Sequence, residues 1–222
     1  MKRFECSAIL FDLDGVLVDS AAYVEQQWRR WASARGLRPE PFLRVCHGRR
    51  AVETIRIAAP ELDADAEVKA LLPTEDPSPG TIAPMAGAVR LLSAMPEGTW
   101  AVATSGPRAS ATARLEHAGL PVPPVLVCAE DVSRGKPMPD VYLLAARGLG
   151  MVPSDCLVVE DAPAGIEAAR TAGMAVVGLA TTHHAHELAA DACAESLAAV
   201  HLGRVDKGVH GRTLLEVLVV DL

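Results

Sequence analysis

The sequence predicts an α/β protein, with a Rossmann-like parallel sheet core and an inserted helical cap subdomain. Short apolar runs of strand length alternate with helical patterns along the chain, which is typical of a parallel sheet covered by helices on both faces. The stretch between the first two runs is far too long for one crossover helix. We therefore expect a second unit to be inserted there.

Five apolar runs are strand candidates, because each has strand length and ends in polar or turn residues. They are Ala8–Phe11, Trp100–Ala103, Val125–Cys128, Leu157–Val159 and Ala175–Leu179. Helical patterns follow three of them, at Ala109–Ala118, Pro139–Gly148 and Pro163–Ala172. A last strand-like run, Leu214–Val220, is predicted to form an edge hairpin with residues near position 200.

The inserted unit reads as a set of helices. Residues 21–35 form the first, with Trp28 and Trp31 expected in the core of the cap. The segment 74–84 is rich in proline and glycine and is predicted to be a linker, after which a core helix follows. We assign residues 17–83 to the cap and residues 1–16 and 84–222 to the α/β core. The other predicted helices are Phe42–Val45, Ala51–Ala58, Ala64–Leu72 and, in the core, Gly87–Ala94.

Composition excludes several classes of partner. The 222 residues carry a net charge of −7, which gives no general attraction to nucleic acid or to an anionic membrane. The first apolar run is too short for a signal peptide or a membrane span. The five cysteines are scattered without a CxxC pair, which favours reduced thiols. We expect a cytoplasmic monomer or weak dimer that binds neither nucleic acid nor membrane.

Polar residues of unusual kind come after four of the apolar runs. Because ligands of an open parallel sheet bind outside the carboxyl ends of its strands, we expect these residues to converge on one crevice. They are Asp12 and Asp14 after the first run, Thr104, Ser105 and Gly106 after the second, Lys136 beyond the third, and Glu160 and Asp161 after the fourth.

This crevice would hold up to four carboxylates, from Asp12, Asp14, Glu160 and Asp161. Two like charges ~4 Å apart repel by roughly 4 kcal/mol at an effective dielectric constant near 20. A bound cation would relieve this repulsion, and hard oxygen ligands suit Mg²⁺. Lys136 adds a second positive charge, and hydroxyl and amide groups add neutral donors. Such a site fits a phosphoryl group, and we therefore expect the partner to be a small phosphorylated metabolite.

The two aspartates of the Asp12-Leu13-Asp14 segment point to the same side of an extended chain. One can attack phosphorus as a nucleophile, and the other can serve the leaving oxygen as acid and the attacking water as base. Spacing alone leaves the order open. We assign Asp12, nearer the end of the strand, as nucleophile and Asp14 as acid/base.

These motifs resemble those of the haloacid dehalogenase superfamily, and within it the capped sugar phosphatases and phosphomutases. FDLDGVLVDS is similar to the family's first motif and VATSG to its second, with Ser105 as the expected phosphate donor. GKPMPD contains the third-motif lysine, and VVEDAPAG the acidic pair of the fourth. Softer similarity in WRRWASARGL and CHGRRAVETI points to hexitol or 2-deoxyglucose-6-phosphate phosphatases.

The resemblance implies an aspartyl-phosphate intermediate on Asp12. It also implies Mg²⁺ held by Asp12, the backbone carbonyl of Asp14 and Asp161, with Glu160 direct or through water. The insertion would then be a cap that closes over the substrate. Dehalogenases of the family lack the second acid of the first motif and need no metal, whereas Asp14 and Asp161 are present here.

Two alternatives to a phosphatase remain at this stage. A β-phosphoglucomutase-like phosphomutase would return the phosphate to sugar, but such mutases have a cap histidine where this chain has Val24. A non-catalytic phosphosugar-binding protein would not need both a nucleophile and an acid/base. The first prediction is therefore a phosphatase.

Several further residues have both a functional and an ordinary interpretation. His47, Gly48, Arg49 and the neighbouring Arg50 lie in a turn of the cap and would contact substrate, or else form a solvated basic loop. Arg108 would extend the phosphate pocket, or else lie exposed in a first helical turn. The trio His183, His184 and His186 lacks paired acids, and we predict a solvated loop rather than a metal cluster.

Overall fold

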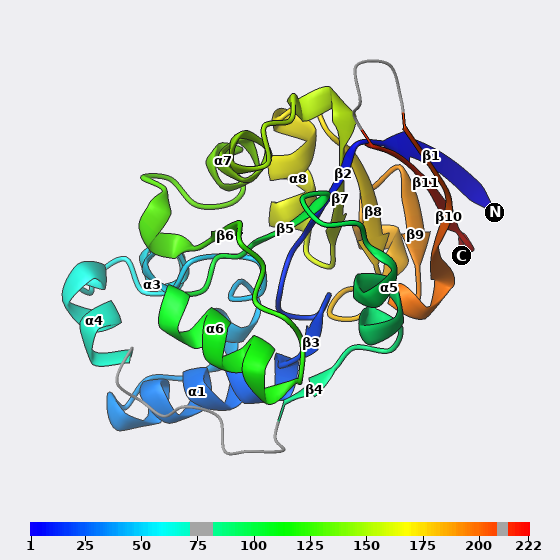
Figure 1. Cartoon of the computed structure of the whole chain (residues 1–222). Coiled ribbons are helices and arrows are strands. Elements are labelled where there is room, and N and C mark those ends of the chain that lie inside the picture. Colours follow the sequence, from blue (N-terminus) through cyan, green and yellow to red (C-terminus); the bar gives the residue numbers. More distant parts are fainter. Residues whose placement is uncertain (72–81, 208–212) are drawn as a thin grey trace.

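The computed structural model describes residues 1–71, 82–207 and 213–222. Its centre is a six-stranded parallel sheet in the order β6-β5-β2-β7-β8-β9, shown in Figure 1. The first strand of this sheet along the chain, β2, lies in its interior, between β5 and β7. The strands are β2 (Ala8–Phe11), β5 (Trp100–Ala103), β6 (Leu126–Val127), β7 (Cys156–Glu160), β8 (Ala175–Leu179) and β9 (Ala192–Ala194).

Helices cover both faces of this sheet, which confirms the predicted fold class. Ile9 and Phe11 of β2 belong to the hydrophobic cluster that contains residues of α5 (Ala88–Ala94) and α6 (Arg108–His117). Ala8 and Leu10 belong to the opposite cluster, with residues of α7 (Asp140–Gly148) and α8 (Pro163–Thr171). Because both faces are buried, β2 is apolar at every position rather than alternating.

The boundaries of the predicted elements differ from the structure by one or two residues. β6 is shorter than the predicted Val125–Cys128, and β7 extends to Cys156 and Glu160 at its two ends. The sixth strand, β9, was missed because three residues are too few to stand out as an apolar run. Short 3₁₀ helices occur at Ala129–Asp131, Pro153–Asp155, Ala185–Glu187 and Leu197–Ala199.

A second, antiparallel sheet consists of β1 (Lys2–Cys6), β11 (Thr213–Val219) and β10 (Val200–Lys207). The predicted pairing of β11 with residues near 200 is present, with Val200 opposite Val219. The prediction that this hairpin stands at an edge is wrong for β11, which is the central strand because β1 pairs with its other side. The sequence pattern did not reveal β1, since most of its residues are polar and partly or fully exposed.

The inserted segment forms four helices: α1 (Ala21–Ala34), α2 (Glu40–Leu43), α3 (Ala51–Ala58) and α4 (Ala64–Leu71). They have a hydrophobic cluster of their own, separate from the two clusters of the core. Trp28 stacks on Phe42 with ring centroids 5.7 Å apart, and Trp31 meets the same ring edge-on at 5.0 Å. Both tryptophans are buried in the cap, as predicted. The helix predicted to begin at Phe42 begins at Glu40, because Pro41 fits the first helical turn.

The chain enters and leaves the cap through two short strands that pair with each other. β3 (Val18–Asp19) lies antiparallel to β4 (Ala83–Pro84). Of the predicted linker 74–84, residues 74–81 lie outside the described part of the chain, as does Leu72 of the predicted fourth cap helix.

The five cysteines are free thiols. Among the described helices, none combines the length and the apolar character that crossing a lipid bilayer requires.

Candidate active site

Loops at the carboxyl ends of neighbouring strands form the wall of one cavity between the core and the cap. Asp12 follows β2, Thr104 follows β5, and Thr182 lies just beyond the end of β8. The cavity has a volume of about 120 Å³. Its lining includes Asp12, Asp14, Gly15, Val24, Trp28, His47, Gly48, Arg49, Thr104, Ser105, Gly106, Ser110, Arg114 and Thr182.

Lys136 lies at the base of this site, with only 1% of its surface exposed. Its Nζ donates to Oδ1 of Asp12 at 2.5 Å and to Oε1 of Glu160 at 2.7 Å. A third hydrogen bond reaches the carbonyl of Ala103 at the end of β5. Burial opposes the charge on Lys136, but the two carboxylates raise the pKa of this amine above its ordinary value. The ammonium charge is therefore retained, and it fixes the nucleophile candidate in place.

Asp12 is 3% exposed and stands at the inner end of the cavity. Burial raises the pKa of Asp12 to about 7. Lys136 opposes this rise, while the negative charges of Glu160 and Asp14 add to it. Without a further cation, the cluster therefore does not hold all of its carboxylates fully ionised at neutral pH.

Glu160 is fully buried and receives four hydrogen bonds. Its Oε1 accepts from Lys136 and from the Tyr142 hydroxyl, and its Oε2 accepts from the amides of Asp161 and Ala162. Gly165 is required beside it, because a Cβ there would lie 1.6 Å from Oε1 of Glu160. Burial, and then the charge of Glu160, raise the pKa of Tyr142, so this phenol stays neutral and donates. Each carboxylate oxygen of Glu160 therefore has two hydrogen-bond donors that fix its position.

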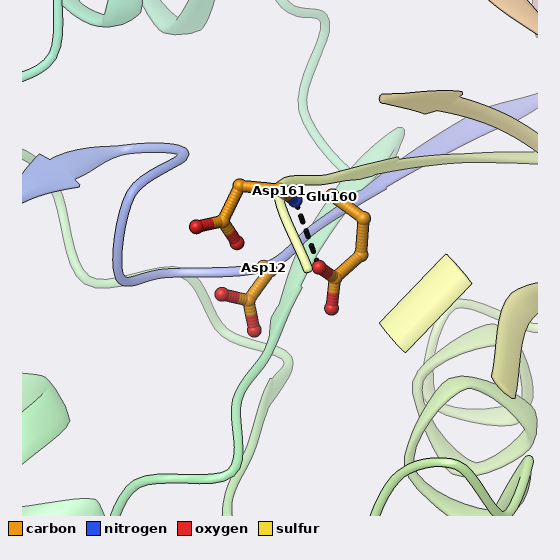
Figure 2. A group of neighbouring side chains, drawn as sticks. All are labelled: Asp12, Glu160 and Asp161. Carbon is orange, nitrogen blue, oxygen red and sulfur yellow. Dashed lines mark hydrogen bonds between the residues drawn. The ribbon is translucent and has the colours of Figure 1, made fainter. Parts of the chain in front are cut away.

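Asp12, Glu160 and Asp161 each offer an oxygen within 4.8 Å of the others, and Figure 2 shows their carboxylates gathered around one point. Among the described residues, no donor reaches Oδ2 of Asp12 or Oδ1 of Asp161. Burial, followed by the charges of Glu160 and Asp12, raises the pKa of Asp161. Buried carboxylates with free oxygens fit a hard divalent cation such as Mg²⁺. Asp12 and Asp161 present the free oxygens, whereas Glu160 already has its four donors.

Asp14 is turned towards the rim of the cavity. Both of its carboxylate oxygens accept from Nη1 of Arg114 at 2.7 Å, and Ser20 at the start of α1 donates to Oδ1 at 2.5 Å. No described hydrogen bond uses the carbonyl oxygen of Asp14. Gly15 follows with φ +79, and a Cβ there would lie 2.2 Å from Oδ2 of Asp161. The Asp-Gly pair therefore brings the first motif into contact with the fourth.

The residues after β5 form a tight turn that faces the cap. Thr104 is almost fully buried, and its hydroxyl accepts from the amide of Gly106 at 3.0 Å. The Ser105 hydroxyl donates to the carbonyl of Gly48 in the cap at 3.0 Å. Ser105 therefore lies at the seam between the two units, while Thr104 stabilises the turn. Arg108 does not line the cavity, because it donates to Asp131 and to the carbonyl of Leu126.

The cap contributes His47, Gly48 and Arg49 to the cavity wall. Nε2 of His47 lies 3.8 Å from Oε1 of Glu25. Burial lowers the pKa of His47, and the nearby His183 adds a smaller effect in the same direction. Gly48 has φ +73, and a Cβ there would lie 2.7 Å from Cβ of Ala162 in the core. Among the described residues, none forms an ion pair with Arg49.

The sequence pattern did not reveal several residues of this site. The fifth strand, β8, is followed by Thr181, which donates to the carbonyl of Gly15, and by Thr182, which donates to Asp161. His183 contacts the carbonyl of Asp161, and its ring centroid lies 6.3 Å from that of His47, so it lies against the site, whereas a solvated loop was predicted. The signal was the same as for the other strands, since polar residues follow an apolar run. Arg114 and Tyr142 lie inside helices and have no such signal.

A family model for haloacid dehalogenase-like hydrolases matches residues 6–173. Hexitol phosphatase A of Escherichia coli (strain K12) is 45% identical over 179 residues, which are 78% of this chain and 83% of that protein. Validoxylamine A 7'-phosphate phosphatase of Streptomyces hygroscopicus subsp. limoneus is 40% identical over 210 residues, which are 87% of this chain and 97% of that protein.

A solved structure of a hydrolase from Pseudomonas syringae superimposes with a TM-score of 0.78 and 28% identity, over 86% of this chain and 94% of its own. The family match covers all four sequence motifs, and the curated relatives extend across both the core and the cap. The resemblance expected from the motifs is thus confirmed. The chain belongs to the haloacid dehalogenase-like hydrolase family.

Proposed function

We propose that the protein is a Mg²⁺-dependent phosphatase for a small sugar or polyol phosphate, acting through an aspartyl-phosphate on Asp12. The observation that supports this most is the environment of Asp12. It combines a buried carboxylate with one free oxygen, an ammonium group on its other oxygen, and a second aspartate at the cavity rim. A binding protein has no need of this combination.

In the first half of the reaction, a carboxylate oxygen of Asp12 attacks phosphorus and forms a P–O bond. The bond between phosphorus and the ester oxygen breaks, and protonated Asp14 gives its proton to that departing oxygen. Lys136 stays hydrogen-bonded to the carboxylate of Asp12 and keeps it aligned.

In the second half, a water molecule attacks the phosphorus of the aspartyl-phosphate. Asp14 takes a proton from this water, the bond from phosphorus to Asp12 breaks, and free phosphate leaves. Asp14 ends protonated and Asp12 ends as a carboxylate, so both groups return to their starting states. Ser105 lines the cavity, and its hydroxyl would exchange the carbonyl of Gly48 for a phosphoryl oxygen.

Mg²⁺ bound by Asp12 and Asp161 would neutralise phosphoryl charge and relieve the repulsion among the carboxylates. The backbone carbonyl of Asp14, which no described hydrogen bond uses, is the third proposed ligand. Glu160 is proposed to hold the other groups in position, because its oxygens already accept four hydrogen bonds.

Two observations support water and a polyol or sugar ester as the substrates. Val24 lines the cavity, so an apolar side chain occupies the cap position at which the phosphomutases of the family have histidine. The hexitol phosphatase is named for a polyol, and its similarity extends over most of this chain.

A phosphate-release screen tests the proposal. The purified protein with Mg²⁺ is incubated with phosphorylated hexoses, deoxyhexoses, hexitols and glycerol, and free phosphate is measured. We expect turnover of at least one polyol or sugar ester, and loss of about a thousandfold or more in the Asp12→Asn variant, because an amide is a poor nucleophile. Release of phosphate by the variant at an undiminished rate would contradict the covalent mechanism. Turnover of a hexose 1-phosphate that needs a bisphosphate primer and releases little phosphate would favour a mutase.

A further inference from the structure

Arg114 is a buried guanidinium inside the catalytic cavity that the proposed reaction does not use. It projects from α6, and 8% of its side chain is exposed. Its Nη1 donates to both oxygens of Asp14, and its guanidinium carbon lies 5.5 Å from the centroid of the Tyr23 ring on α1. The side chain therefore bridges the core and the cap directly beside the proposed acid/base.

Much of this guanidinium's hydrogen-bonding capacity is unused. Arginine has five N–H donors in one plane, and the Asp14 pair uses those of a single nitrogen. Nε is buried without a hydrogen-bond partner, and among the described residues no acceptor meets Nη2. A buried donor without an acceptor is costly, and native proteins rarely leave one at a position without a role.

The charge on Arg114 limits which kind of substrate group can accept a hydrogen bond from its unused donors. The guanidinium is already held by the carboxyl group of Asp14. A second carboxylate or phosphate would compete with Asp14 for this guanidinium and draw it away from the acid/base. A hydroxyl group accepts a hydrogen bond at no such cost.

The position of Asp14 indicates where on the substrate this accepting group lies. As acid/base, Asp14 must reach the oxygen between phosphorus and the first carbon of the leaving group. Arg114 holds Asp14 and lines the same cavity, and because Nε is shielded, its Nη2 group is the one available to a substituent near that first carbon. We propose that Arg114 is a specificity residue that binds the substrate hydroxyl on the carbon adjacent to the phosphorylated carbon. This inference rests on the proposed function and adds to it the class of substrate, namely esters of vicinal diols.

The experiment compares two substrates that differ in this single hydroxyl: glucitol 6-phosphate and 5-deoxyglucitol 6-phosphate. For the unmodified protein we expect kcat/KM to be about tenfold or more higher with the 5-hydroxyl present. Phosphoglycolate, which has a carboxylate at this place, should be the poorest of the three. This comparison needs no variant, so it does not depend on whether a variant folds.

Arg114→Lys then assigns the preference to this side chain. The variant keeps a cation beside Asp14 but loses the planar set of donors. We expect the ratio of kcat/KM between the two glucitol esters to fall towards one. Arg90→Lys is the matched control, since Arg90 donates to backbone carbonyls at residues 197–200, away from the cavity. An equal loss for both esters, with the ratio unchanged, would mean that Arg114 only positions Asp14 and would overturn the inference.

Binding separates this inference from the proposed function. The affinities of both esters for the Asp12→Asn protein with Mg²⁺ are measured by calorimetry, in the Arg114 and the Arg114→Lys backgrounds. A difference of about tenfold that disappears with Arg114→Lys supports the subsite even if neither ester is turned over. Equal affinities, or no binding of either ester, overturn the subsite even if other phosphate esters are hydrolysed.

Discussion

Glu53 in the cap accepts a hydrogen bond at 2.9 Å from the backbone amide of Gly135 in the core, the residue next to Lys136. Arg50 supports this contact, because its guanidinium donates to Glu53 and to the carbonyls of Val132 and Ser133. A Cβ on Gly135 would lie 2.4 Å from Oε2 of Glu53, so the fit requires glycine. The start of α3 is therefore hydrogen-bonded to the loop that contains Lys136.

Glu53→Gln is expected to weaken this contact and to lower kcat/KM about tenfold. The charged acceptor becomes a neutral one, and a hydrogen bond to a charged group contributes about 1.5–3 kcal/mol. Steady-state kinetics at saturating Mg²⁺ is the measurement. Glu61→Gln, at an exposed cap position, is the control and should match the unmodified protein. Equal kinetics for the two variants would show that the contact has no part in turnover.

Lys136→Met is expected to destabilise the fold by about 3–5 kcal/mol, because it leaves two buried carboxylates without their cation. Urea unfolding measures the change in the free energy of unfolding. Adding Glu160→Gln to this variant should recover part of the loss, since it removes one of the uncompensated charges. A double variant less stable than Lys136→Met alone would contradict this account of the cluster.

In metal-free protein, the Asp12→Asn variant is expected to gain stability relative to the unmodified protein as pH rises. Burial places the pKa of Asp12 at about 7, against an ordinary 3.8, so ionising this group costs the folded state more than the unfolded state. This cost grows from about pH 4 to pH 7, by up to about 1.4 kcal/mol per pH unit, and levels off above about pH 8. The measurement is the difference in the free energy of unfolding between the two proteins in EDTA, from pH 5 to 8. A difference that is flat, or that grows towards acid pH, would refute the expectation.

Mg²⁺ is expected to raise the Tm of the unmodified protein, and Asp161→Asn to remove most of that rise. A ligand that binds the folded state stabilises it by RT ln(1 + [L]/Kd), and Asp161 offers an oxygen that no described donor uses. Thermal unfolding across a Mg²⁺ titration measures the effect. Glu116→Gln, exposed on α6, should keep the full rise. A full rise in Asp161→Asn would place the cation elsewhere.

The parallel sheet and the meeting of Asp12, Lys136 and Asp161 could be anticipated because each rests on a local signal. An apolar run such as Ala8–Phe11 reports a buried strand, and the polar residue after it reports the sheet edge where ligands bind. The order of strands then brings together residues that are remote in sequence, such as Asp12 and Lys136.

The remaining features depend on tertiary packing. Arg114 lies mid-helix, and nothing local distinguishes it from a solvated arginine until α6 packs beside Asp14. Lys2–Cys6 reads as polar because one edge strand needs few buried side chains. Arg108 was a candidate on position alone, yet Asp131 competes for its guanidinium.

The pairing of β3 with β4 sets the two ends of the cap side by side, with Val18 opposite Pro84 and Asp19 opposite Ala83. Seen from the core, the insertion therefore begins and ends at two adjacent, paired strands. A different module whose ends have this spacing would leave the register of the six-stranded sheet unchanged. Such chimaeras would keep the strand end that presents Asp12 while exchanging the surface that selects what reaches it, so reaction and selectivity can be engineered as separate parts.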